Sequence, residues 1–140
     1  MSRLTKPFLL LSLLCVSLCT AAQLPREDGE RMRYGIEIDM RGAYLSGICS
    51  MLYEDGMLKA AIVNEFGVSA IAFTYDPRKD KVRIVSATDN LDKWYIRRML
   101  RHDLRECLHC LQQGVFTYEN KKRGMTYMFS PQDNPLTSQQ

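Results

Sequence analysis

The stretch NLDKWYIRRMLRHDLRECLHCLQQ, residues 90–113, decides the fold, because here the spacing of apolar residues changes from two to about four. It contains neither proline nor glycine, and Gly114 follows it as a stop signal. Asp89 or Asn90 is the candidate N-cap. Its apolar residues fall on one stripe of a helical wheel: Ile96, Leu100, Leu104, Cys107, Leu108 and Leu111. The pattern predicts one long amphipathic helix.

Upstream of this helix, apolar and polar residues alternate with the period of a half-buried strand. Turn signals such as Glu54-Asp55-Gly56 separate the runs. The connections are too short for parallel crossovers, so we expect antiparallel pairing. The predicted strands cover residues 34–41, 43–53, 57–66, 68–76 and 81–87.

Downstream, residues 115–119 and 125–129 form a predicted hairpin around the loop NKKRG. We therefore expect an α+β fold, in which a curved, half-barrel-like antiparallel sheet of about seven strands packs on the one helix. The domain should span residues 34–130. Residues 23–33 are polar and indicate a flexible leader, and residues 131–140 indicate a disordered tail.

Several predicted strands carry apolar residues on both faces. In 43–53, Leu45, Cys49 and Met51 alternate with another apolar set. Either both faces are covered, or one face borders a cavity for a ligand. The candidate ligand-facing residues are Tyr44, Ile48, Leu52, Ile62 and Phe73.

The first 22 residues have the pattern of a secretory signal peptide: a basic start, an apolar run and the small-residue site Thr20-Ala21-Ala22. We expect export to the periplasm or the outer membrane. Acylation of Cys19, which would make a lipoprotein, is the alternative. Cleavage after Ala22 leaves 17 basic and 16 acidic residues. A net charge near zero offers no argument for nucleic-acid binding.

The segment ECLHC, residues 106–110, suggests chemistry that its context argues against. Covalent haem attachment requires histidine directly after the second cysteine, where Leu111 stands. A redox pair belongs at a helix N-terminus, whereas this pair lies near the helix end. Zinc needs about four converging ligands, and Cys107 and His109 project to nearly opposite sides. We predict no catalytic residue, cofactor or metal.

We therefore prefer a purely structural role for the residues of ECLHC. Cys107 should be a core residue, Cys110 should lie at the edge of the stripe, and His109 should be solvated. Export favours oxidation, so a disulfide from Cys49 to Cys107 or to Cys110 remains open, with one thiol left over.

Basic residues gather on the polar side of the predicted helix. Arg98, Arg101 and Arg105 recur at i, i+3 and i+7, and residues 121–123 form a second basic group in the hairpin loop. This face is either a solvated surface or a contact for anionic lipids or an acidic envelope protein. Trp94 and Tyr95, at the helix start, are expected to pack on the sheet.

Residues 42–112 resemble a group of small exported envelope proteins of Gram-negative bacteria. The resemblance lies in an SG pair that opens a strand, in NEFG, in FTYD and in LDKWYIRRMLRHDL. Those proteins in turn resemble the periplasmic carriers and receptors of lipoprotein localisation. That second resemblance implies a half-open antiparallel barrel with a helical lid over an apolar cavity, and it implies no catalytic residues.

Two functions follow as hypotheses. The first is a non-enzymatic exported protein that binds a lipid or a lipoprotein acyl chain in its half-barrel. The second is a packed interaction domain without a cavity that docks on an envelope partner through the basic helix face. The sequence does not indicate an oligomeric state.

Overall fold

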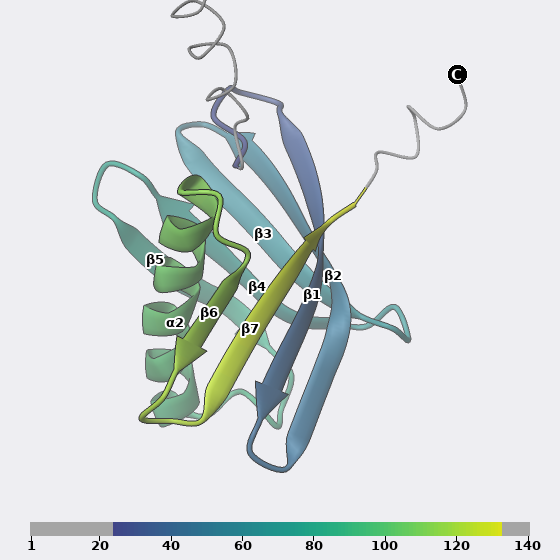
Figure 1. Ribbon diagram of the computed structural model, residues 1–140. Coiled ribbons are helices and arrows are strands. Elements are labelled where there is room, and N and C mark those ends of the chain that lie inside the picture. The colour runs from purple at the N-terminus through teal and green to yellow at the C-terminus, as the bar shows by residue number, and fades with distance from the viewer. Residues whose placement is uncertain (1–23, 133–140) are drawn as a thin grey trace, which may run out of the picture.

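The computed structural model describes residues 24–132, so the predicted signal peptide, Cys19 and all but the start of the predicted tail lie outside the described residues. Seven strands and one helix make up this part of the chain (Figure 1). The elements are β1 (Arg31–Met40), β2 (Ala43–Glu54), β3 (Met57–Asn64), β4 (Ser69–Asp76), β5 (Lys81–Ala87), α2 (Trp94–Gln112), β6 (Thr117–Asn120) and β7 (Met125–Pro131).

All seven strands belong to one antiparallel sheet with the order β5-β4-β3-β2-β1-β7-β6. The sheet curls so strongly that its two edge strands, β5 and β6, both come to lie against α2 (Figure 1). The helix thus fills the opening of a half-barrel. The predicted α+β fold is confirmed, and this architecture is compatible with the half-open barrel that the resemblance implied.

The core lies between the inner face of the sheet and one side of the helix. In β1 the inner residues Tyr34, Ile36 and Ile38 alternate with more exposed ones, as a half-buried strand requires. The helix contributes residues spaced by three and four, namely Leu100, Asp103, Leu104, Cys107, Leu108 and Leu111. This set matches the predicted stripe with two changes: Ile96 is only partly buried, and Asp103 is fully buried.

The predicted boundary between the leader and the domain, at residue 34, was wrong. Residues 23–33 were expected to be a flexible leader, yet β1 begins at Arg31 and Leu24 belongs to the core. The backbone N–H of Gly29 also donates a 2.7 Å hydrogen bond to the carbonyl oxygen of Tyr53. The polar composition of the segment did not predict this ordered structure, because a single apolar residue and backbone hydrogen bonds hold the segment in place.

The helix and the last strand also differ from expectation at their ends. The N-cap is Lys93, without a side-chain cap hydrogen bond, rather than Asp89 or Asn90. Residues 88–92 form turns instead, and the Asp92 carboxylate pairs with Arg97 on the first turn of the helix. At the other end β7 continues to Pro131, the first residue of the predicted tail.

Gly47 allows β2 and β3 to approach closely where the sheet bends. It pairs with Asn64, next to a register irregularity between Ile62 and Val63. A Cβ atom at this position would lie 2.0 Å from the carbonyl oxygen of Val63, which no real side chain tolerates. Glycine in a strand interior often marks such a bulge or bend. The glycine of the SG pair noted in the sequence therefore has a steric reason here.

Candidate functional site

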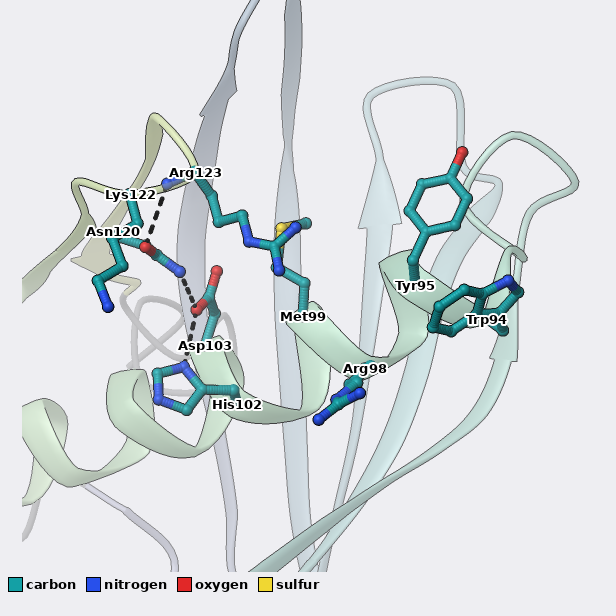
Figure 2. A pocket seen from close by; sticks show the side chains of 9 residues that line it. All are labelled: Trp94, Tyr95, Arg98, Met99, His102, Asp103, Asn120, Lys122 and Arg123. Carbon is teal, nitrogen blue, oxygen red and sulfur yellow. Dashed lines mark hydrogen bonds and ion pairs between the residues drawn. The ribbon is translucent and has the colours of Figure 1, made fainter.

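A groove of about 630 Å³ lies between the N-terminal half of α2 and the turn that joins β6 to β7 (Figure 2). Its volume is in the range of small-molecule sites. The helix contributes Trp94, Tyr95, Arg98, Met99, His102 and Asp103, and the strand end and turn contribute Asn120, Lys122 and Arg123. The helical members recur every three or four residues, which places them on one side of the helix.

Asp103 forms the fully buried floor of this groove. Its Oδ2 accepts a 2.7 Å hydrogen bond from the Tyr127 hydroxyl, and its Oδ1 accepts a 2.9 Å hydrogen bond from Asn120 Nδ2. His102 Nδ1 lies 3.1 Å from the same Oδ1. Burying a carboxylate is costly unless hydrogen bonds compensate. Since both oxygens are occupied, Asp103 acts here as a structural anchor.

The Tyr127 hydroxyl acts only as a hydrogen-bond donor in this contact. Burial is the largest influence that raises its pKa, and the nearby charge of Asp103 raises it further. The phenol therefore stays protonated and continues to donate to Asp103 over the physiological pH range.

Asn120 joins the floor of the groove to its rim. Its Nδ2 donates to Asp103, and its Oδ1 accepts a 3.3 Å hydrogen bond from the backbone N–H of Arg123 (Figure 2). The same side chain thus contacts the helix and the basic turn. As a result, the turn that carries Lys122 is held against α2.

Three cationic side chains border the groove: Arg98 from the helix, and Lys122 and Arg123 from the turn. Among residues 24–132, none of the three forms an ion pair with a carboxylate. In Figure 2 the Arg123 side chain extends from the turn back towards Met99 on the helix. The groove therefore combines a net positive charge with a concave shape.

Two aromatic residues stand at one end of this groove. Trp94 and Tyr95 are 75% and 47% exposed, and their rings meet edge to face with centroids 5.8 Å apart. They were expected to pack on the sheet, and that prediction was wrong. The helix begins at Trp94, so both side chains lie on its first turn.

The predicted arginine face is divided by the structure. Arg98 lines the groove, whereas Arg101 is exposed outside it. Arg105 lies about two turns further along α2, where Glu106 is 3.7 Å away. The pKa of Asp80 is lowered there, mainly by the hydrogen bond from Tyr75 and least by the charge of Arg105. The Nε of Arg105 is buried without a hydrogen-bond partner among the described residues. Only one of the three predicted arginines joins the second basic group.

The five predicted ligand-facing residues do not lie together either. Ile62 and Phe73 point inward and are buried in the same cluster as the helix leucines. Cys49 pairs with Ile62, so the inner face of β2 is its odd-numbered one. Tyr44, Ile48 and Leu52 therefore lie on the outer face, where Tyr44 is 60% exposed. One shared apolar cavity cannot contain all five.

The three described cysteines are free thiols, so no disulfide joins sheet to helix in residues 24–132. Cys49 and Cys107 are buried, and Cys110 lies at the edge as expected. Burial raises the pKa of Cys49 to about 12 and also raises the pKa of Cys107. No cluster of three or more metal-ligating side chains occurs within the described part of the chain.

His109 is not simply solvated, which corrects the sequence interpretation. Its Nε2 lies 2.6 Å from Asp80 Oδ1, and the Tyr75 hydroxyl donates a 2.7 Å hydrogen bond to the same oxygen. These contacts lower the pKa of Asp80, with the Tyr75 hydrogen bond as the largest cause. The β4–β5 turn is thereby tied to α2, away from the groove.

No protein-family model, curated protein or solved structure matches the chain. Within residues 24–132, α2 lacks the combination of length and apolar character that a membrane span requires.

Proposed function

We propose that this chain is an exported, non-enzymatic envelope protein that binds anionic lipid headgroups through the groove between α2 and the β6–β7 turn. The observation that carries the proposal is that three cations without ion-pair partners among the described residues, Arg98, Lys122 and Arg123, line one groove together with the exposed Trp94. The signal-peptide pattern supports export, and the fully occupied carboxylate of Asp103 supports a binding role without a catalytic base.

The chemistry of this surface suits a membrane interface. Each well-placed Lys or Arg contributes about 1 kcal/mol of attraction to an anionic membrane. Tryptophan and tyrosine favour the headgroup level, because their rings are apolar on one side and polar at one end. Since the three cations are exposed to solvent, their attraction should weaken with salt, which screens charges beyond about 8 Å at physiological ionic strength.

Sedimentation with lipid vesicles tests the proposal. The purified protein should sediment with vesicles containing phosphatidylglycerol and remain in solution with neutral phosphatidylcholine vesicles. The triple variant Arg98→Glu/Lys122→Glu/Arg123→Glu should lose this binding. A matched control, Arg31→Glu/Arg33→Glu/Arg83→Glu, changes the net charge equally at exposed positions of the sheet and should retain it.

Two results would overturn the headgroup proposal. One is equal sedimentation of the unmodified protein with anionic and neutral vesicles at low salt. The other is equal loss of binding in the groove variant and the sheet variant, which would mean that net charge alone matters. If the unmodified protein does not sediment with vesicles and the groove variant loses binding to an envelope protein, the chain is an interaction domain.

The curled sheet with a single helix favours a second candidate, binding of an acyl chain inside the half-barrel. Ile62 and Phe73 would face such a chain, but they are buried together with Leu104 and Leu108 of the helix. A ligand could reach them only if α2 moved away from the edge strands. Native mass spectrometry of the purified protein tests this, since a bound acyl chain would appear as a defined added mass.

A further inference from the structure

We infer that the groove recognises a phosphate monoester, the group that ends the headgroup of a lipid such as phosphatidic acid. The inference rests on the proposed function and specifies the headgroup. It follows from the number of cations, from the two segments that supply them, and from the way in which the turn is held in place.

The number of cationic side chains in the groove matches a phosphate monoester. A phosphate monoester carries a charge of about −1.5 to −2 at neutral pH and offers three acceptor oxygens. The diester of a phosphatidylglycerol headgroup carries a single charge and two such oxygens. Arg98, Lys122 and Arg123 supply three cationic side chains to one groove. Two of them are arginines, whose planar guanidinium can bind two phosphate oxygens at once.

The electrostatics of the groove favour more than one negative charge. Asp103 is the one carboxylate among its lining residues, and both its oxygens already accept hydrogen bonds from Tyr127 and Asn120. A fourth cation lies against the same turn: the Arg41 side chain passes over Gly124, where a Cβ atom would lie only 2.5 Å from Arg41 Nε. The cations outnumber this one carboxylate, so the net positive charge of the groove attracts a dianion more than a monoanion.

The turn is also fixed before any ligand arrives. Asn120 joins Asp103 to the backbone of Arg123, so the two arms of the groove keep their separation. Binding then costs little ordering of the backbone, which increases affinity for a group of the matching size. Simple attraction to a charged bilayer would need no such support.

The test compares two anionic lipids at matched surface charge. Vesicles of phosphatidylcholine containing either phosphatidic acid or phosphatidylglycerol are adjusted to equal zeta potential, and the affinity of the full protein for each is measured. We expect phosphatidic acid to bind at least about fivefold more tightly. The conservative variants Lys122→Gln and Arg123→Gln should reduce this ratio, whereas Arg101→Gln, outside the groove, should not.

The possible outcomes separate this inference from the function on which it rests. Equal affinity for both lipids overturns phosphate-monoester recognition and leaves anionic headgroup binding intact. Failure to bind either lipid overturns both. Competition with soluble glycerol 3-phosphate identifies the source of the phosphate: displacement at micromolar concentrations would show that a free metabolite, not a bilayer, is the ligand. We expect no displacement there, because the bilayer adds contacts to Trp94 that the soluble ester lacks.

Discussion

The Tyr127 hydroxyl donates a 2.7 Å hydrogen bond to Asp103 Oδ2, and neither side chain has any surface exposed to solvent. This contact joins β7, which lies between β1 and the edge strand β6, to the helix that covers the sheet. It also sets the floor of the groove, so stability and the candidate site depend on the same pair.

Replacing Tyr127 with phenylalanine should destabilise the protein by about 1–3 kcal/mol, because a buried carboxylate oxygen then loses its donor. Urea denaturation followed by circular dichroism measures the change. Tyr95→Phe is the matched control, since it removes a hydroxyl from an exposed ring and should change the stability by less than about 0.5 kcal/mol.

A double variant separates the hydrogen bond from packing. In Asp103→Leu/Tyr127→Phe both polar partners are absent, so no unsatisfied group remains between them. The double variant should therefore lose less stability than the sum of its two single variants. Strict additivity would show that the two side chains contribute independently.

The thiols should react in an order set by burial. Cys110 should react first with a thiol reagent such as Ellman's, whereas Cys49, with its pKa raised to about 12 by burial, should react only when the protein unfolds.

Cys107→Ser should destabilise the fold by about 1–3 kcal/mol by burying a hydroxyl in an apolar site. Cys110→Ser, at the edge of the helix stripe, serves as the control. Equal effects of the two substitutions would contradict this assignment.

The contact of Asp80 with Tyr75 and His109 should make stability depend on pH in acid. The folded pKa of Asp80 lies below its value in the unfolded chain. Its contribution is therefore complete above the unfolded pKa of about 3.9 and disappears as the pH falls through the lower folded value. Asp80→Asn should lower the urea midpoint at pH 6 but have little effect at the lowest pH at which the protein remains folded.

Asparagine is the suitable replacement at this position because Asp80 has a φ of 50°, a conformation that asparagine tolerates. If the urea midpoints of the unmodified protein and of Asp80→Asn differ by the same amount from pH 6 into strong acid, this would argue against an ionised Asp80 in the contact.

Gly47→Ala should destabilise the sheet by more than about 2 kcal/mol, because the added methyl group meets the backbone of β3 rather than a movable side chain. Gly35→Ala is the control. There the nearest atom, 2.8 Å away, is the end of the flexible Gln132 side chain. Thermal unfolding of both variants would distinguish them, and similar midpoints would be inconsistent with a close approach at Gly47.

The sequence predicted the fold because each strand and the helix carries its own period of apolar residues. The five-strand meander, the helix and the hairpin needed only this local signal. The ends of the elements were harder to predict. Leu24 is one apolar residue in a polar segment, and contacts distant in sequence order it. The helix begins only at Trp94, because the residues that looked like its N-cap, Asp89 and Asn90, form a turn instead.

The candidate site was predicted only in part, because it combines residues from two elements. Arg98 and the basic turn were each noticed, but their meeting depends on how the hairpin packs beside α2, which no local pattern encodes. Asp103 was missed although a signal existed: it stands three residues after Leu100 and four before Cys107, inside the apolar stripe. A lone carboxylate on the buried side of a helix should have indicated a partner in the sheet.

The pairing of β1 with β7 constrains how the chain can reach its native state. Tyr34 stands opposite Pro131, so strands from the two ends of the described chain lie side by side. While the polypeptide is being made, one edge of β1 remains without its hydrogen-bonding neighbour until the last strand has emerged. An unpaired strand edge invites association with other chains. The newly made protein is therefore most vulnerable to aggregation before its C-terminal hairpin docks.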